Sequence, residues 1–184
     1  MSELKQENKD IREYKRQVLQ HALAEGLKVG CLFLLQGISL LLYRWGIISS
    51  LLFIIGFIGI PILLYRMGVQ LRDNSYGGYI KYMQVVSYLS WIYIASLVVA
   101  FLSYYVSCYI LFNDPNFTAM LEESLEMLQE IAQNNEQYAM AIKAIQSITP
   151  IQLAWNIILN AFVNGVIYIY IIALFIKCKP EQMM

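Results

Sequence analysis

The chain has 184 residues, of which 59% are hydrophobic and 14% are charged. Soluble domains carry about a quarter charged residues, so this composition is that of a membrane protein. Thirteen Lys and Arg balance thirteen Asp and Glu, and nothing in this composition points to a nucleic-acid partner. One histidine and three widely spaced cysteines indicate no zinc site and no disulfide framework, so we expect no metal and no cofactor.

Four apolar stretches are each long enough to cross a hydrocarbon layer of about 30 Å as a helix, which takes about 20 residues. They cover residues 22–43, 47–65, 83–112 and 151–176. The last two contain no charged residue, whereas Glu25 and Lys28 lie near the start of the first, at a spacing that allows an ion pair on a helix. The sequence therefore predicts four transmembrane helices in a single membrane domain.

The first two predicted spans lie close together near the N-terminus, and the second contains a proline. A cleaved signal peptide is the alternative for the first span, but the charged segment before it is too long and no Ala-x-Ala cleavage site follows. Only Arg44-Trp45-Gly46 separates it from the second span, so we expect a tight antiparallel hairpin. Pro61 lies late in the second span, where the loss of a backbone donor should kink or loosen the last turns.

Lys and Arg are distributed unevenly among the segments outside the spans. Ten lie in the N-terminal segment (1–21), the second connection and the C-terminal tail (177–184), whereas only Arg44 and Lys143 lie in the other two connections. Positively charged residues are retained on the cytoplasmic side of a membrane. Both termini are therefore predicted to be cytoplasmic, with residues 114–149 on the other side.

Residues 114–149 have the pattern of an amphipathic helical hairpin. Asp114-Pro115 combines a capping residue with a proline at the first helical position. Apolar residues recur at helical spacing on both sides of Asn134-Asn135, which interrupts the pattern, and acidic residues occupy the remaining faces. Residues 1–21 are similarly amphipathic. The predicted fold class is all-α: four transmembrane helices, an extracytoplasmic helical hairpin and an N-terminal interfacial helix.

Two of the predicted spans carry a polar face at membrane depth. In the fourth span, amide residues recur every four positions at Gln152, Asn156, Asn160 and Asn164. In the third span, the hydroxyl residues include Ser96, Ser103 and Ser107. Polar groups in hydrocarbon need hydrogen-bond partners, so we expect these serines to oppose the amides, with Gln36 of the first span joining them. Two interpretations stay open: contacts that hold the helices together, which is the simpler one, and a polar conduction path.

Basic residues flank the spans on the predicted cytoplasmic side at Arg66, Arg72 and Lys81. Because basic residues at that surface attract anionic lipids, these three side chains are candidate contacts to lipid headgroups. The simpler interpretation is that they only orient the spans.

Several short motifs resemble those of one protein family. They are Arg72-Asp73, Gly77-Gly78-Tyr79-Ile80 and Tyr82 before the third span, Phe112, Asp114-Pro115 and Phe117 at the start of the outer segment, and Thr149-Pro150 before the fourth span. In these motifs the chain resembles the domain-of-unknown-function 4199 family of bacterial membrane proteins, over nearly its whole length. The resemblance implies a four-helix protein of the bacterial cytoplasmic membrane, hints at a lipid-linked glycosyltransferase as a partner, and assigns no catalytic or binding residue.

Two function classes fit the sequence. No carboxylate or histidine lies deep in a span and no nucleophile–base spacing is present, so we do not expect an enzyme. An accessory or scaffolding subunit would bind a larger membrane protein through its lipid-facing surface and outer hairpin. A small oligomeric transporter or channel would use the polar face of the fourth span, but the spans have no evident inverted repeat. We favour the accessory role, with another membrane protein or a second copy as the partner.

Overall fold

The computed structural model describes residues 2–131 and 142–176; for residues 2–19, 130 and 131 it describes the course of the helix and not the side chains. Helices account for nearly all of this part of the chain. They are α1 (Ser2–Leu41), α2 (Gly46–Tyr76), α3 (Tyr82–Phe112), α4 (Pro115–Ile131) and α6 (Pro150–Ile176), with a short 3-10 turn, η1 (Tyr43–Trp45), between α1 and α2. Residues 142–146 are also helical.

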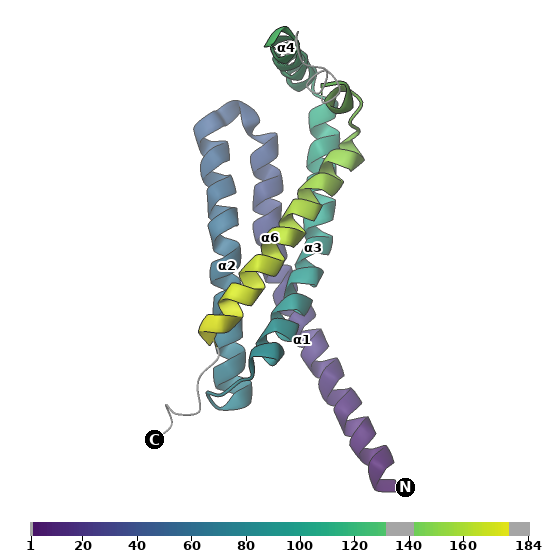
Figure 1. Cartoon of the computed structure of the whole chain (residues 1–184), viewed down its shortest axis with the longest axis vertical. Coiled ribbons are helices and arrows are strands. Elements are labelled where there is room, and N and C mark those ends of the chain that lie inside the picture. The colour runs from purple at the N-terminus through teal and green to yellow at the C-terminus, as the bar shows by residue number, and fades with distance from the viewer. Residues whose placement is uncertain (1, 132–141, 177–184) are drawn as a thin grey trace.

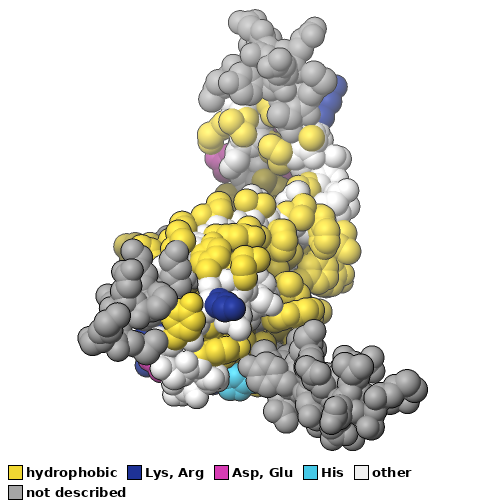
Figure 2. Space-filling view, turned by 60° about the horizontal axis from the view of Figure 1, so that its bottom comes forward, with side chains coloured by type: hydrophobic (Ala, Val, Ile, Leu, Met, Phe, Trp, Pro, Cys, Tyr) yellow, Lys and Arg dark blue, Asp and Glu magenta, His cyan; other side chains and the backbone are white. Residues whose placement is uncertain are grey.

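Four segments are long and apolar enough to cross a membrane. They are Gln20–Leu41, Tyr43–Tyr76, Tyr82–Phe112 and Pro150–Ile176. The predicted all-α class with four membrane-length helices is therefore confirmed. Figure 1 shows α1 and α2 as a hairpin, α6 crossing in front of the bundle, and α4 beyond the far end of α3. Apolar side chains cover much of the face of the bundle that Figure 2 presents, as expected of helices that contact hydrocarbon.

The first two helices are longer than the spans predicted within them. α1 continues without a break from Ser2 to Leu41, so residues 2–21 and the first span form one helix. α2 passes through Pro61 and continues to Tyr76. Its last turns stay helical because Met67 and Gly68 are buried, with Gly68 lying against the side chain of Ile176. The helix then ends at Gly77, whose φ of +60° is the left-handed conformation that favours glycine at a helix end.

The core of the bundle lies along the contact between α1 and α3, which we call the α1–α3 seam. Gly26 of α1 lies so close to α3 that a Cβ built on it would be 2.6 Å from the Cβ of Ala95 and 2.8 Å from the carbonyl oxygen of Ile92. Gly30 is similarly close to Val99. Small residues let membrane helices approach closely, which increases their van der Waals contact. The two glycines therefore set the distance between the helices that carry most of the core.

The α4 end of the molecule is attached through the short connection after α3. Asp114 caps α4: its Oδ1 accepts a hydrogen bond from the backbone N–H of Asn116 at 3.0 Å, which agrees with the predicted start of a helix. Leu125 of α4 is buried together with Ile142, and Leu121 packs against them. The turn predicted at Asn134-Asn135 lies outside the described residues, so the hairpin as a whole remains a prediction.

Candidate functional site: a polar-lined groove at membrane depth

The serines of α3 face α1 rather than the amides of α6. Ser107 donates a hydrogen bond to the carbonyl oxygen of Gly37 at 2.9 Å, and Ser103 donates to that of Phe33 at 3.4 Å. Ser96 is fully buried and donates to the carbonyl of Tyr93 in its own helix at 2.7 Å. These hydroxyl groups are thus engaged within the α1–α3 seam. The pairing of serines with amides that the sequence suggested does not occur, because α3 turns its small residues toward the glycines of α1.

Gln152 has a local role at the start of α6. Its side-chain oxygen accepts the backbone N–H of Thr149 at 2.9 Å, while the Thr149 hydroxyl accepts the backbone N–H of Gln152 at 3.4 Å. This reciprocal pair is a capping box, which satisfies backbone donors at a helix N-terminus. Gln152 therefore belongs to the helix cap and not to the polar face that continues deeper in the span.

Asn156, Asn160 and Asn164 are all exposed on the surface of the bundle. Asn160 donates to the carbonyl oxygen of Asn156 at 3.0 Å, a contact within α6 itself. Among the described residues, no hydrogen bond joins these three amides to another helix. Because amide groups in hydrocarbon need hydrogen-bond partners, most of the donors and acceptors on this face are left without one in the isolated chain.

Asn160 and Asn164 form part of the wall of a groove of about 200 Å³ that all four membrane-length helices line. The remaining wall is mainly aromatic. Phe53 and Phe57 come from α2, Phe33 and Gln36 from α1, Tyr93 and Tyr104 from α3, and Tyr168 from α6. The groove thus combines a large apolar surface with two amides whose donors and acceptors are not used by another helix.

Two tyrosines that the sequence did not single out as a site hold the floor of this groove. The Tyr104 hydroxyl donates to Oε1 of Gln36 at 2.6 Å, so the polar group of α1 is satisfied by α3. The Tyr93 hydroxyl donates to the carbonyl oxygen of Ala161 at 2.6 Å. Gly165 makes room for this contact, since a Cβ there would collide with the Tyr93 ring. The two bonds tie α1, α3 and α6 together beneath the exposed amides.

The basic residues named as lipid contacts have different surroundings. Arg72 donates to Asp73 Oδ1 at 2.7 Å and to the carbonyl oxygen of Ile176 at 3.4 Å, so it connects α2 to the end of α6. Arg66 and Lys81 are exposed. Their contact with lipid headgroups stays a prediction.

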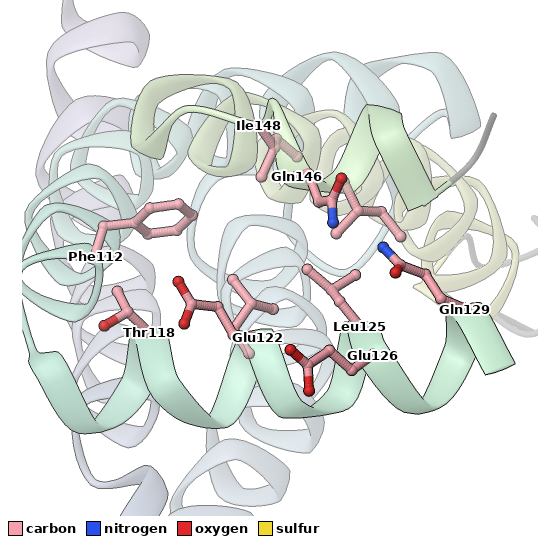
Figure 3. Close-up of a pocket in the computed structure, with 10 residues that line it drawn as sticks. Phe112, Thr118, Glu122, Leu125, Glu126, Gln129, Gln146 and Ile148 are labelled. Carbon is pink, nitrogen blue, oxygen red and sulfur yellow. The ribbon is translucent and has the colours of Figure 1, made fainter. Parts of the chain in front are cut away.

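A cavity of about 460 Å³ lies at the α4 end, between α4 and the segment before α6 (Figure 3). Glu122, Glu126 and Gln129 line it from α4 and Gln146 lies across from them, while Leu125 and Ile148 supply apolar surface. No group of three or more potential metal-binding side chains occurs in the described part of the chain. The cavity therefore combines polar and apolar side chains on one surface.

Asp114 also joins the α1–α2 turn to α4. Tyr43 donates to its Oδ2 at 2.9 Å, and the Arg44 guanidinium lies 3.6 Å from its Oδ1. Hydrogen bonds from Asn116, together with the one from Tyr43, lower the pKa of the Asp114 carboxyl to about 2. The sequence indicated only the capping role of Asp114, because its partners in the turn lie about seventy residues earlier in the chain.

The comparison with protein families gives one result. A family model described as protein of unknown function (DUF4199) matches residues 21–178, which cover the four membrane-length segments except for Gln20. No curated protein and no solved structure matches the chain.

Proposed function

This chain belongs to the DUF4199 family, whose function is unknown, and we propose that it is an accessory subunit that binds a larger membrane protein through the groove beside α6. The observation that carries the proposal is the exposure of Asn156, Asn160 and Asn164 at membrane depth without a partner in another helix. A bilayer offers no water to satisfy these amides, so a protein partner would stabilise them.

The groove fits a transmembrane helix of such a partner. Its aromatic wall, which includes Phe53 and Phe57, offers apolar surface along which a helix can pack. Asn160 and Asn164 offer both donors and acceptors to hydroxyl or amide side chains on that helix. Cross-helix hydrogen bonds of this kind contribute about 0.6 kcal/mol each on average in one measured membrane protein, so affinity would come mainly from packing and the amides would set the register.

The proposed topology is that of a multi-pass protein of the bacterial cytoplasmic membrane with both termini in the cytoplasm. It rests on the distribution of Lys and Arg, ten of which lie on the side of the termini and two on the side of α4. In this orientation the cavity beside α4 and the Asp114 network lie outside the cytoplasm. We expect a partner with its own membrane helices, and an enzyme that uses lipid-linked sugars is the first class to look for.

A pull-down from native membranes tests the proposal. The tagged chain is extracted in mild detergent, and the proteins that accompany it are identified by mass spectrometry. We expect one dominant membrane protein, whose recovery falls sharply in the double variant Asn160→Leu with Asn164→Leu. Val98→Leu, at an exposed apolar position on α3, is the matched control and should leave recovery unchanged. Recovery of the chain alone, as an oligomer, would contradict the accessory role and favour the transporter or channel.

Cysteine labelling in intact cells tests the topology. Single cysteines are placed at Ser124 in α4 and at Ser75 near the end of α2, both of which are exposed, in a chain whose native cysteines are replaced by serine. We expect an impermeant maleimide to label the cysteine at position 124 and not the one at position 75. The reverse pattern would overturn the proposed orientation.

A further inference from the structure

We propose that a small polar pocket at the end of the bundle opposite α4 binds a primary ammonium group, and that this group belongs to the headgroup of an aminophospholipid such as phosphatidylethanolamine. The pocket has a volume of about 210 Å³ and lies among α1, α2 and α3. It is separate from the groove beside α6, so the inference is independent of the proposed function.

The position of the pocket is that of a lipid headgroup. The membrane-length segments begin at Gln20, end at Tyr76 and begin again at Tyr82, and the pocket is formed close to these three ends. Glu25 lies three residues after the start of the first predicted span, at residue 22, and Gln70, Asn74 and Ser75 follow the end of the second, at residue 65. The pocket therefore lies at the predicted boundary between the hydrocarbon layer and the cytoplasmic surface.

Glu25 lines the pocket and carries the only formal charge among its described lining residues. It is 8% exposed, although a buried carboxylate is costly unless it is paired. Its Oε1 accepts a hydrogen bond from Lys28 Nζ at 2.6 Å, and the Lys28 side chain is itself 64% exposed. No described residue contains a buried side-chain oxygen without a partner, so the second carboxylate oxygen of Glu25, for which no hydrogen bond is found, keeps some accessible surface. One carboxylate oxygen is thus available to a ligand.

The other polar groups of the pocket suit a cation that can donate several hydrogen bonds. Gln70, Asn74 and Ser75 line it from the last turns of α2 and are exposed, so their oxygens can accept from a ligand without leaving the core. His21 and Tyr88 stack with ring centroids 6.3 Å apart, and aromatic faces attract cations. Among the described residues, neither Lys nor Arg lines the pocket itself, and the nearest cation given is Lys28, which pairs with Glu25. A primary ammonium group has three N–H donors and the matching charge.

The surroundings favour a lipid over a metal ion as the source of the charge. Divalent cations such as Ca²⁺ take six or more oxygen ligands, often from several carboxylates, and one carboxylate is found among the described residues of this pocket. The exposed ammonium of Lys28 lies next to Glu25 and can meet the phosphate of the same lipid. A zwitterionic headgroup would therefore find both of its charges matched.

Native mass spectrometry of the purified chain tests the inference. The protein is incubated with equal amounts of phosphatidylethanolamine and phosphatidylglycerol, and the two lipid adducts are compared. We expect the ethanolamine lipid to be retained about tenfold more, the ratio that one charge-assisted hydrogen bond of about 1.4 kcal/mol produces. In Glu25→Gln the two adducts should become equal. Glu122→Gln, the same change at an exposed carboxylate in α4, is the control and should keep the preference.

Further variants separate binding from folding and identify the source of the amine. Gln70 is exposed, so Gln70→Leu should fold normally and still lower the preference for the ethanolamine lipid. Equal retention of both lipids by the unaltered chain, or a preference that survives in Glu25→Gln, would overturn the inference. Loss of the bound lipid on addition of millimolar ethanolamine would overturn the lipid source and identify a soluble amine as the ligand.

Discussion

The α1–α3 seam and the outward face of α6 both carry polar residues at membrane depth, but they use them differently. In one apolar 18-residue stretch of each helix, 44% of the residues of α1 and of α3 are buried, against 28% of α6 and 17% of α2. The serines of the seam donate to carbonyl oxygens across a short distance, whereas the amides of α6 reach no other helix among the described residues. Polar side chains in a span therefore indicate a contact, and packing decides whether that contact is internal or left for a partner.

The largest expected loss of folding stability follows substitution of Gly26 in the α1–α3 seam. Gly26→Leu would place a side chain against the Ile92 carbonyl oxygen and the Cβ of Ala95, neither of which can move by a simple side-chain rotation. Overpacking of a core costs about 1–3 kcal/mol, and contact with backbone places this change at the upper end. Thermal unfolding in detergent measures the loss. Ala24→Leu, at an exposed position two residues earlier on the same helix, is the matched control and should be nearly neutral.

An intermediate loss of stability is expected when the hydrogen bond from Tyr104 to Gln36 is removed, at the place where the α1–α3 seam meets the groove. Tyr104→Phe removes the donor and leaves the Gln36 oxygen buried without a partner, which costs about 1–3 kcal/mol. Adding Gln36→Leu removes the unsatisfied oxygen as well, so the double variant should recover most of the stability. A double variant whose loss equals the sum of the two single losses would contradict this account.

A smaller loss of stability is expected at the α4 end when the pH is lowered. There the Asp114 carboxylate accepts hydrogen bonds from Tyr43 and Asn116 and pairs with Arg44. Its pKa in the folded chain, about 2, is below the ordinary value of 3.8, so the ionised carboxylate is the form that stabilises the fold. The contribution is complete above pH 3.8 and is lost as the pH falls toward 2. Hydrogen exchange at the start of α4, corrected for the intrinsic effect of pH, should show this opening. Asp114→Asn should remove the pH dependence, and Tyr43→Phe should shift it to higher pH.

The smallest expected effect on stability is at the outward face of α6. Asn160→Leu replaces an exposed amide that bonds only within its own helix, so the free energy of unfolding should change by less than about 0.5 kcal/mol. The same substitution should weaken binding of the proposed partner. A large loss of stability in the isolated chain, measured in the same detergent as Gly26→Leu, would place Asn160 with the internal contacts of the seam.

Hydropathy was sufficient to predict the four membrane-length helices, because each depends only on its own residues. The end of α2 was not predictable in this way, since its last turns are stabilised by the contact of Gly68 with Ile176, more than one hundred residues later. The sequence also did not predict that the α3 serines contact α1. The spacing of polar residues shows that they share one face of a helix, but it does not show which other helix packs against that face. Gln152 is different: the sequence Thr149-Pro150-Ile151-Gln152 carries the spacing of a capping box, so its role could have been predicted.

The unbroken course of α1 has a mechanical consequence. The helix begins at Ser2, whereas the predicted span begins at residue 22, so the residues before the span extend about 30 Å at 1.5 Å per residue (Figure 1). A tilt of roughly 5° at the α1–α3 seam would move the far end of this segment by roughly 3 Å, as follows from its length. Any molecule that holds the first turns of α1 would therefore exert a torque on the seam itself.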